Sequence, residues 1–338
     1  MRQTPLIIEK LSVGYTVGSE KTVLLSDISV TLERGEFACL VGANGTGKSS
    51  LIRTIAGLQK QISGNTFLMG RNLAGLSMVK IADKMSVVLT GNVYQPELSV
   101  YDFVSLGRYA YTGWRGNLTA DDRRAVSKAL EFTQTTKFQK KTIGSLSDGE
   151  RQLAMVALGL AQEPEIMILD EPTAYLDVHR RAHFTELMRQ LAREADIAIL
   201  CSTHDLGLAL RTADTFWLIT HSAAFFSGAP EDLALSGTLD HIFDGQMLCF
   251  DHEACGFRTR QKYIGTATVR ADGLVRLWTE RVLTRMGYKL VEICDNQAKH
   301  VHVSGYRVSH SIYWIADING QSHRVDSLKE LNMVLTTV

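Results

Sequence analysis

A glycine-rich octapeptide running from Gly42 to Ser49 constrains the fold of this chain more than any other feature. Its sequence, Gly-Ala-Asn-Gly-Thr-Gly-Lys-Ser, follows the apolar run Phe37–Val41 and opens a helical pattern over Gly47–Gly57. Glycines at these positions let backbone N–H groups turn inward around an anion, and the N-terminus of the following helix adds a positive dipole end. Strand, tight loop and helix in this order predict a phosphate-binding loop.

The residues of this loop suit the different parts of a nucleoside triphosphate. Lys48 is expected to reach the β- and γ-phosphates, and the Ser49 hydroxyl is expected to ligate Mg²⁺. Backbone groups and small side chains are expected to supply the other contacts, from Gly42, Asn44, Gly45, Thr46, Gly47 and Ser50.

A pair of carboxylates supplies the partner that such a loop requires. The buried-strand pattern Ile166–Leu169 ends at Asp170, 122 residues after Lys48 (positions 170 and 48), and Glu171 follows at once. We expect Asp170 to hold Mg²⁺, and Glu171 to polarise the attacking water as a general base. Loop and carboxylates together predict a nucleotide triphosphatase that uses ATP and Mg²⁺.

Short, almost wholly apolar runs recur up to residue 201 and indicate an α/β domain. Such runs are typical of a parallel sheet buried on both faces, and between them apolar residues recur at helical spacing, as in Leu153, Val156, Ala157 and Leu160. The expected strands are Phe37–Val41, Met85–Leu89, Ile166–Leu169 and Ala198–Cys201, with an added antiparallel β layer from Thr22–Leu32 and Asn65–Met69.

The length of 338 residues corresponds to about two domains. We place the boundary near Gly228-Ala229-Pro230, with a nucleotide-binding domain over 1–235 and a small α+β domain over 236–338, so that a chain ending near Gly237 is expected to fold and bind ATP. The second domain is expected to contain strands Thr266–Arg270, Lys289–Ile293, Lys299–Ser304 and Ser311–Asp317 and helices Val275–Met286 and Ser327–Leu335.

Composition excludes some classes of function. Lys plus Arg and Asp plus Glu number 36 each, and this neutral balance argues against a chain that coats nucleic acid. No apolar run approaches the 18 residues that a membrane span needs, and the N-terminal charges Glu9 and Lys10 argue against a signal peptide. An odd count of five cysteines predicts thiols in a reducing, cytoplasmic setting.

Three further motifs appear in a fixed order around the carboxylate pair. Leu146–Gln152 opens a helix before it, and Ala174–Asp177 and Ser202–Asp205 follow it. In order and spacing the chain resembles the ATP-binding cassette (ABC) ATPases, with their signature motif, D-loop and switch histidine. Tyr15 matches the family aromatic that stacks on adenine. The resemblance covers about residues 5–235.

The resemblance implies a fold and an active assembly. The fold is the P-loop NTPase of ABC ATPase type, with a parallel sheet core, an antiparallel β layer and a helical signature subdomain. The active unit is a head-to-tail homodimer, in which Ser147, Gly149 and Glu150 contact ATP held by the partner's loop. Asp177 is the D-loop acid. His204 senses the γ-phosphate and acts in catalysis with Glu171 and Lys48.

Within that family the chain is most similar to cassettes of iron–siderophore, haem and cobalamin importers, on the segments Val100–Tyr109 and Leu118–Asp122. This implies integral membrane permease subunits, indirectly a substrate-binding protein, and a peripheral place on the cytoplasmic face of the inner membrane. The alternative is a soluble cassette ATPase in repair, translation or cluster assembly. A single phosphate loop, and too little room between the motifs for a coiled coil, favour the importer.

Two positions depart from the family pattern. Asp148 and Glu150 replace a glycine and a glutamine of the usual signature. After the strand Met85–Leu89 the family places a glutamine that touches Mg²⁺ and the attacking water. This chain has Thr90 there, and Gln95 lies five residues further on, so both stay candidates for the role and Thr90 for the metal.

The C-terminal region holds two further patterns. Residues 258–289 contain eight basic residues against two acidic ones, which suits either anionic lipid head groups, an acidic partner or a solvated helix face. Cys249, His252 and Cys255 have the residue types of a metal site, but no second pair follows at zinc-finger distance. We expect a regulatory or dimerising domain.

Overall fold

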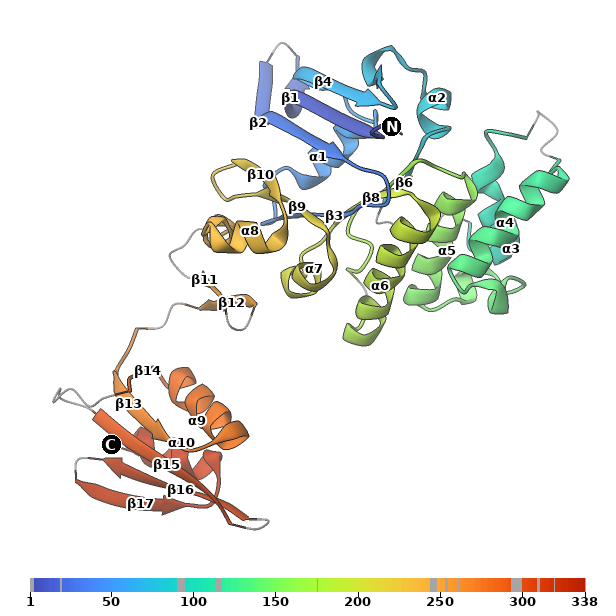
Figure 1. The fold of residues 1–338 in the computed structure, drawn as a ribbon. Helices are drawn as coiled ribbons and strands as arrows, with labels where there is room; N and C mark the ends of the chain where they lie inside the picture. Colours follow the sequence, from blue (N-terminus) through green and yellow to red (C-terminus); the bar gives the residue numbers. More distant parts are fainter. Residues whose placement is uncertain are drawn as a thin grey trace. The chain divides into compact units, whose positions relative to one another are not determined.

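Contacts between residues divide the chain into two units, residues 1–258 and 259–338 (Figure 1). The computed structural model describes residues 3–18, 20–89, 95–112, 117–174, 176–243, 248–252, 255–259, 262–292, 300–308, 311–318 and 320–337.

A six-stranded sheet forms the centre of the first unit. Its order is β10-β9-β3-β8-β7-β6, and all neighbours are parallel except β10, which runs antiparallel to β9. Along β3, Phe37, Cys39 and Val41 enter the core on one face, while Ala38 and Leu40 enter the core on the other. This confirms a parallel sheet buried on both faces. The strands are β3 (Phe37–Gly42), β6 (Met85–Val88), β7 (Ile166–Leu169), β8 (Ala198–Ser202), β9 (Thr215–Ile219) and β10 (Phe225–Gly228).

An antiparallel sheet of order β2-β1-β4-β5 packs over one of these faces, with helix α1 (Lys48–Ile55) in the shared core. The expected antiparallel layer is therefore confirmed, and it also contains β1, which the sequence did not indicate. Its strands are β1 (Leu6–Val17), β2 (Glu20–Leu32), β4 (Ser63–Leu68) and β5 (Arg71–Asn72).

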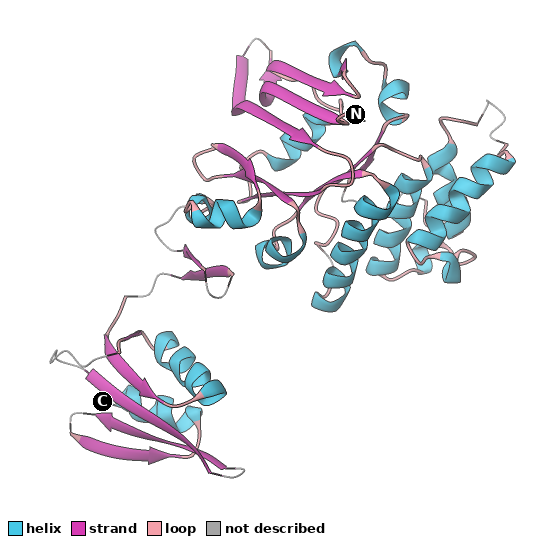
Figure 2. Ribbon diagram, viewed as in Figure 1, coloured by secondary structure: helices cyan, strands magenta, loops and turns pink. Residues whose placement is uncertain are grey.

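Helices cover the opposite face and extend into a helical subdomain (Figure 2). Helix α6 (Val178–Ala195) packs on the sheet through Phe184, Met188 and Leu191, whereas α3, α4 and α5 share a separate apolar core. The remaining helices of the first unit are α2 (Met78–Ala82), α3 (Val100–Ser105), α4 (Ala120–Phe132), α5 (Asp148–Ala161), α7 (Leu206–Thr212) and α8 (Pro230–Leu235).

The first unit extends beyond the boundary expected from sequence, to residue 258 rather than 235. After α8, the chain adds strands β11 (Leu248–Asp251) and β12 (Gly256–Thr259). Leu239, Ile242 and Phe250 of this stretch are buried in the same core as α6 and the parallel sheet. The proline at position 230 starts α8 and does not mark a linker, because Pro is favoured in the first turn of a helix.

The second unit is a five-stranded sheet with two helices. The order is β14-β13-β15-β16-β17, with β13 parallel to both neighbours and the other pairs antiparallel. Leu283 of α9 and Leu331 and Leu335 of α10 pack on the sheet. Ile293 and Lys299, at the ends of two expected strands, lie outside the described residues. The elements are β13 (Gly265–Arg270), α9 (Gly273–Arg285), β14 (Tyr288–Leu290), β15 (His300–Val308), β16 (Ser311–Ile318), β17 (Gln321–Val325) and α10 (Leu328–Thr337).

Within the described ranges, every helix is too short or too polar to cross a membrane.

Candidate active site

The glycine-rich loop joins β3 to α1, as the sequence predicts. Gly47 caps the N-terminus of α1 with a φ of 100°, a region that side chains rarely adopt, and a Cβ atom there would lie 3.3 Å from the Leu25 side chain. Thr46 closes the loop by donating its hydroxyl to the Ala43 carbonyl at 2.9 Å. The loop therefore directs the first N–H groups of α1 toward its concave side, where an anion is favoured.

Lys48 is the cation of this loop, and its side chain is buried (5% exposed). Its Nζ donates to the carbonyl oxygens of Gly42 at 2.8 Å and Ala43 at 2.9 Å. Burial lowers the pKa of Lys48, while the negative charges of Glu171 and Asp170 act in the opposite direction. The ammonium is thus held at the loop, with two carboxylates in its field.

Ser202 connects the two carboxylates at the end of β7. Its hydroxyl donates to Oδ1 of Asp170 at 2.7 Å and accepts the backbone N–H of Glu171 at 2.8 Å. Ser202 is fully buried and ends β8, the neighbour of β7. Glu171 itself has a positive φ of 49°. The chain therefore turns at the end of β7, and the hydrogen bonds to Ser202 hold Asp170 and the Glu171 backbone in place.

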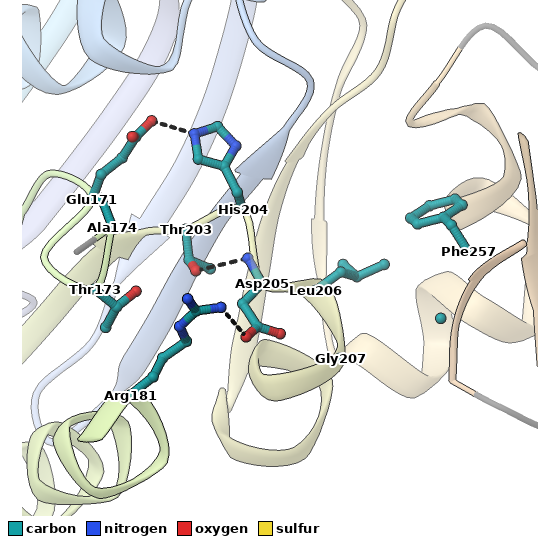
Figure 3. A pocket seen from close by; sticks show the side chains of 11 residues that line it. Glu171, Thr173, Ala174, Arg181, Thr203, His204, Asp205, Leu206, Gly207 and Phe257 are labelled. Carbon is teal, nitrogen blue, oxygen red and sulfur yellow. Dashed lines mark hydrogen bonds and ion pairs between the residues drawn. The ribbon is translucent and has the colours of Figure 1, made fainter. Parts of the chain in front are cut away.

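His204 lies directly against Glu171. Its Nε2 atom is 2.5 Å from Oε1 of the carboxylate, and Figure 3 shows the two side chains pointing toward each other from separate loops. Both are part-exposed, so each can be reached from solvent. At this distance the carboxylate and the imidazole hydrogen-bond directly to each other, and the other carboxylate oxygen of Glu171 is left to accept a hydrogen bond from water.

A cavity of about 510 Å³ opens beside this pair. Its wall combines the carboxylate and imidazole with the ion pair between Arg181 and Asp205, and Phe257 of β12 closes the far side (Figure 3). The lining residues are Glu171, Thr173, Ala174, Arg181, Thr203, His204, Asp205, Leu206, Gly207, Gly256 and Phe257.

Ser147 and Glu150 form a reciprocal cap at the start of α5. The Ser147 hydroxyl accepts the Glu150 N–H at 3.4 Å, and Oε2 of Glu150 accepts the Ser147 N–H at 2.9 Å. Hydrogen bonds from the Ser147 backbone and then its hydroxyl lower the pKa of Glu150. Asp148 turns toward Arg151 on the same helix, 3.0 Å away, and is largely exposed. The acidic replacements in this motif thus have local partners.

Arg180 of α6 contacts both of the segments that the sequence predicts as signature motif and D-loop. Its Nη1 donates to the Ser147 hydroxyl at 3.2 Å, and its Nε is 3.6 Å from Oδ2 of Asp177, the N-cap of α6. A Cβ atom on Gly149 would come within 3.0 Å of the Arg180 Cδ. Glycine at 149 therefore leaves room for this arginine.

Most of the other expected residues are exposed. Tyr15 lies on β1 with half its side chain exposed, Asn44 and Gly45 are exposed in the loop, and Ser49 and Ser50 lie in the first turn of α1. Gln95 is exposed. Thr90, the other candidate for its role, lies outside the described residues.

Sequence reasoning missed two residues of this site, Ser202 and Arg181. The sequence assigns Ser202 only to the start of the motif Ser202–Asp205, although a serine that ends a buried strand beside Thr203-His204 is a usable signal. The sequence offers no signal for Arg181, because its ion pair with Asp205 joins two segments 24 residues apart.

A phosphate loop on a buried parallel strand, with paired carboxylates at the end of β7, defines a P-loop nucleotide triphosphatase. The family model described as "ABC transporter" matches residues 25–174, and that described as "Iron ABC transporter C-terminal domain" matches residues 265–336. An uncharacterized ABC transporter ATP-binding protein of Methanocaldococcus jannaschii is 37% identical over 236 residues, 70% of this chain and 80% of that protein. The chain belongs to the family of ABC transporter ATP-binding proteins, which are ATPases.

Other relatives and structures agree with this assignment. A petrobactin import ATP-binding protein of Bacillus anthracis is 31% identical, with 65% of this chain and 80% of that protein aligned. The ferric enterobactin transport ATP-binding protein of Escherichia coli is 29% identical, and the alignment covers 73% of this chain and 90% of that protein. The structure of CbiO1 of Clostridium perfringens, part of the ABC transporter complex CbiONQ, superposes with a TM-score of 0.60 at 26% identity. The match covers 70% of this chain and 93% of that chain. The non-transport alternative is not favoured.

Proposed function

We propose that this chain is the ATP-hydrolysing subunit of an importer for ferric chelates of the siderophore type. The observation that carries the hydrolytic role is the pairing of Glu171 with His204, beside an Asp170 carboxylate that Ser202 holds in place. The cargo class is supported by the petrobactin and ferric enterobactin transport systems of the relatives in Bacillus anthracis and Escherichia coli and by the iron-transporter family match over the second unit.

In this proposal Glu171 is the general base for attack on the γ-phosphate. Its carboxylate takes a proton from water as the water oxygen bonds to phosphorus, and the bond to the β-phosphate oxygen breaks to give ADP and phosphate. His204 donates or accepts a hydrogen bond at the same place and so orients the water. Lys48 offsets the phosphate charge, and the Tyr15 ring stacks on adenine.

The donor set also fits Mg²⁺. Asp170 offers a carboxylate that is 7% exposed and held by Ser202, and Ser49 offers a hydroxyl at the start of α1, both hard oxygen donors of the kind that Mg²⁺ takes with water and phosphate. When bound, the ion would neutralise charge on the phosphates. We assign Ser49 and Asp170 as its ligands, and Thr90 as a further candidate.

The proposal includes a homodimer and a membrane partner. Ser147, Gly149 and Glu150 contact ATP on the partner cassette, and Asp177 contacts the partner at the D-loop. The capped start of α5 supports this, because a helix N-terminus with a small-residue turn is an anion cradle. Permease subunits, with a substrate-binding protein outside, place the chain on the cytoplasmic face of the membrane. The second unit regulates or braces the dimer.

The test is uptake of a radiolabelled ferric siderophore by cells that lack the chain. Wild-type chain restores uptake, and Lys48→Ala fails to restore it because ATP binding is lost. The matched control is Arg53→Ala, which removes an exposed cation from the same helix and restores uptake. If the purified chain hydrolyses ATP but the wild-type chain does not restore uptake, the proposed cargo class is wrong while the proposed ATPase activity stands.

A further inference from the structure

Helix α9 of the second unit presents large apolar side chains on its outer face. Leu274 is 64% exposed, Leu277 is 44% exposed and Trp278 is 51% exposed. They recur at i, i+3 and i+4, so they form one stripe along the helix. The opposite side of α9 is already used, because Val282 and Leu283 are buried and Thr279 accepts the indole N–H of Trp314 at 2.7 Å. An apolar stripe of this kind marks an interaction surface.

Basic side chains continue the same stripe toward the C-terminal end of α9. Arg281 and Arg285 follow Trp278 at i+3 and i+7, and the Arg281 guanidinium lies 5.1 Å from the centre of the Trp278 ring. Glu280, on the flank of the stripe, is paired with Arg276 at 2.7 Å. The acidic charge on this helix is thus balanced by a neighbour, and the net charge along the outer face is positive.

The second unit as a whole is also positively charged. Residues 259–338 contain eleven lysines and arginines against seven aspartates and glutamates, a formal +4, whereas the entire chain is neutral. Basic residues are attracted to an anionic lipid surface, and tryptophan and leucine favour the boundary between head groups and acyl chains. The outer face of α9 offers both features, arginines for the anionic head groups and a tryptophan with two leucines for the boundary with the acyl chains.

We propose that this outer face of α9, the α9 stripe (Leu274, Leu277, Trp278, Arg281 and Arg285), docks on an anionic phospholipid surface. The contact is additional to any contact with a permease and rests on the proposed function only in placing the chain at a membrane. Leu274 and Trp278 enter the head-group layer, while Arg281 and Arg285 pair with lipid phosphates.

The experiment is co-sedimentation of the full-length purified chain with vesicles. One preparation is phosphatidylcholine alone, and the other is phosphatidylcholine with 30% phosphatidylglycerol. We expect at least tenfold tighter binding to the anionic vesicles at low salt. Arg281→Gln with Arg285→Gln should weaken this binding about tenfold or more. Arg307→Gln with Arg324→Gln, which removes two exposed charges from β15 and β17, should change it less than threefold.

Tryptophan fluorescence supplies a second readout that does not depend on charge. Brominated lipids quench an inserted indole. The measurement uses a Trp114→Phe background, in which the tryptophans other than Trp278 are Trp217 and Trp314, both buried, so quenching should report Trp278. Trp278→Phe should keep vesicle binding and lose most of the quenching. Leu274→Ser should weaken binding even at high salt, where the charge attraction is screened.

Several results would overturn the proposal. Equal binding to both vesicle preparations, an equal loss in the Arg307/Arg324 control, or quenching that survives in Trp278→Phe would each contradict it. The Arg281/Arg285 variant could also lose a dimer in sedimentation while its vesicle binding stays unchanged. That result would contradict the proposal and show that a second copy of the chain covers the α9 stripe. ATP hydrolysis measured on the same samples separates these outcomes from failure of the proposed function.

Discussion

Arg181 donates from Nη1 to Oδ2 of Asp205 over 2.9 Å, and the same guanidinium donates from Nη2 to the carbonyl oxygen of Leu176 at 3.1 Å. Asp205 follows His204 directly, and Leu176 directly precedes Asp177. One side chain of α6 therefore links the segment that faces a partner cassette in the proposed dimer to the loop that carries His204.

Replacing this arginine should slow turnover without weakening ATP binding. Arg181→Gln leaves the phosphate loop intact but releases the His204 loop, so we expect kcat to fall about tenfold at nearly constant KM. Asp205→Asn should have a similar effect. Because both side chains are about 30% exposed, the interaction energy from the double variant should be about 1 kcal/mol.

The matched control for this pair is on the same helix. Arg193→Gln removes the 2.8 Å ion pair with Asp214, away from the cavity, and should leave kcat unchanged. Strict additivity of the Arg181 and Asp205 effects on kcat would show that the pair does not act through the shared loop.

Removal of the proposed base should separate binding from hydrolysis. Glu171→Gln keeps the shape of the side chain and loses the proton acceptor, so ATP binding should persist while turnover falls by about 10²–10⁴. The variant should accumulate as an ATP-dependent dimer in sedimentation, because the bound ATP is not consumed. Glu194→Gln, an exposed residue of α6, serves as the control. Near-normal turnover in Glu171→Gln would remove this residue from the chemistry.

Local sequence patterns predicted the phosphate loop and the central strands β3, β6, β7 and β8, but not the two remaining strands of that sheet, β9 and β10. Ile166–Leu169 is apolar at every position, and the structure places β7 at those same residues. Strand β17 was missed, because Gln321–Val325 is an edge strand in which only Val325 is buried. The role of Ser202 needed the pairing of β7 with β8, whose residues Ile166 and Ala198 are neighbours only after folding. Contacts of this long-range kind follow from topology rather than from residue pattern.

The helical subdomain contains a buried ion pair whose stability should depend on pH. Oδ1 of Asp122 is 2.9 Å from Nε of Arg108, and both side chains are almost fully buried. Hydrogen bonds from the Thr119 hydroxyl and backbone N–H, followed by the Arg108 contact, lower the pKa of Asp122 to about 2. Because the folded pKa lies below the ordinary value of 3.8, the stabilisation is fully present above about pH 4 and is lost as the pH falls through 2.

We therefore expect Asp122→Asn to lower the free energy of unfolding by about 3 kcal/mol at pH 7, since it leaves Arg108 buried with a weaker partner. The difference from wild type should shrink between pH 4 and pH 2. Urea unfolding followed by circular dichroism measures both quantities. Asp121→Asn, with an exposed side chain one residue earlier, should be nearly neutral. A difference that grows on acidification would contradict the assigned direction of the pKa shift.

The last prediction concerns where the first unit can be cut. A chain ending at Thr259 keeps β12 and should bind ATP with the affinity of the full chain, because its core is complete. A chain ending at Gly237, which the sequence alone indicated as sufficient, loses Leu239, Ile242 and Phe250 from that core. At about 1.5–3 kcal/mol for each buried side chain, this loss is comparable to the whole stability of a domain. The shorter chain should be unfolded or insoluble, whereas equal melting temperatures for the two truncations would show that residues 238–259 are dispensable to the cassette.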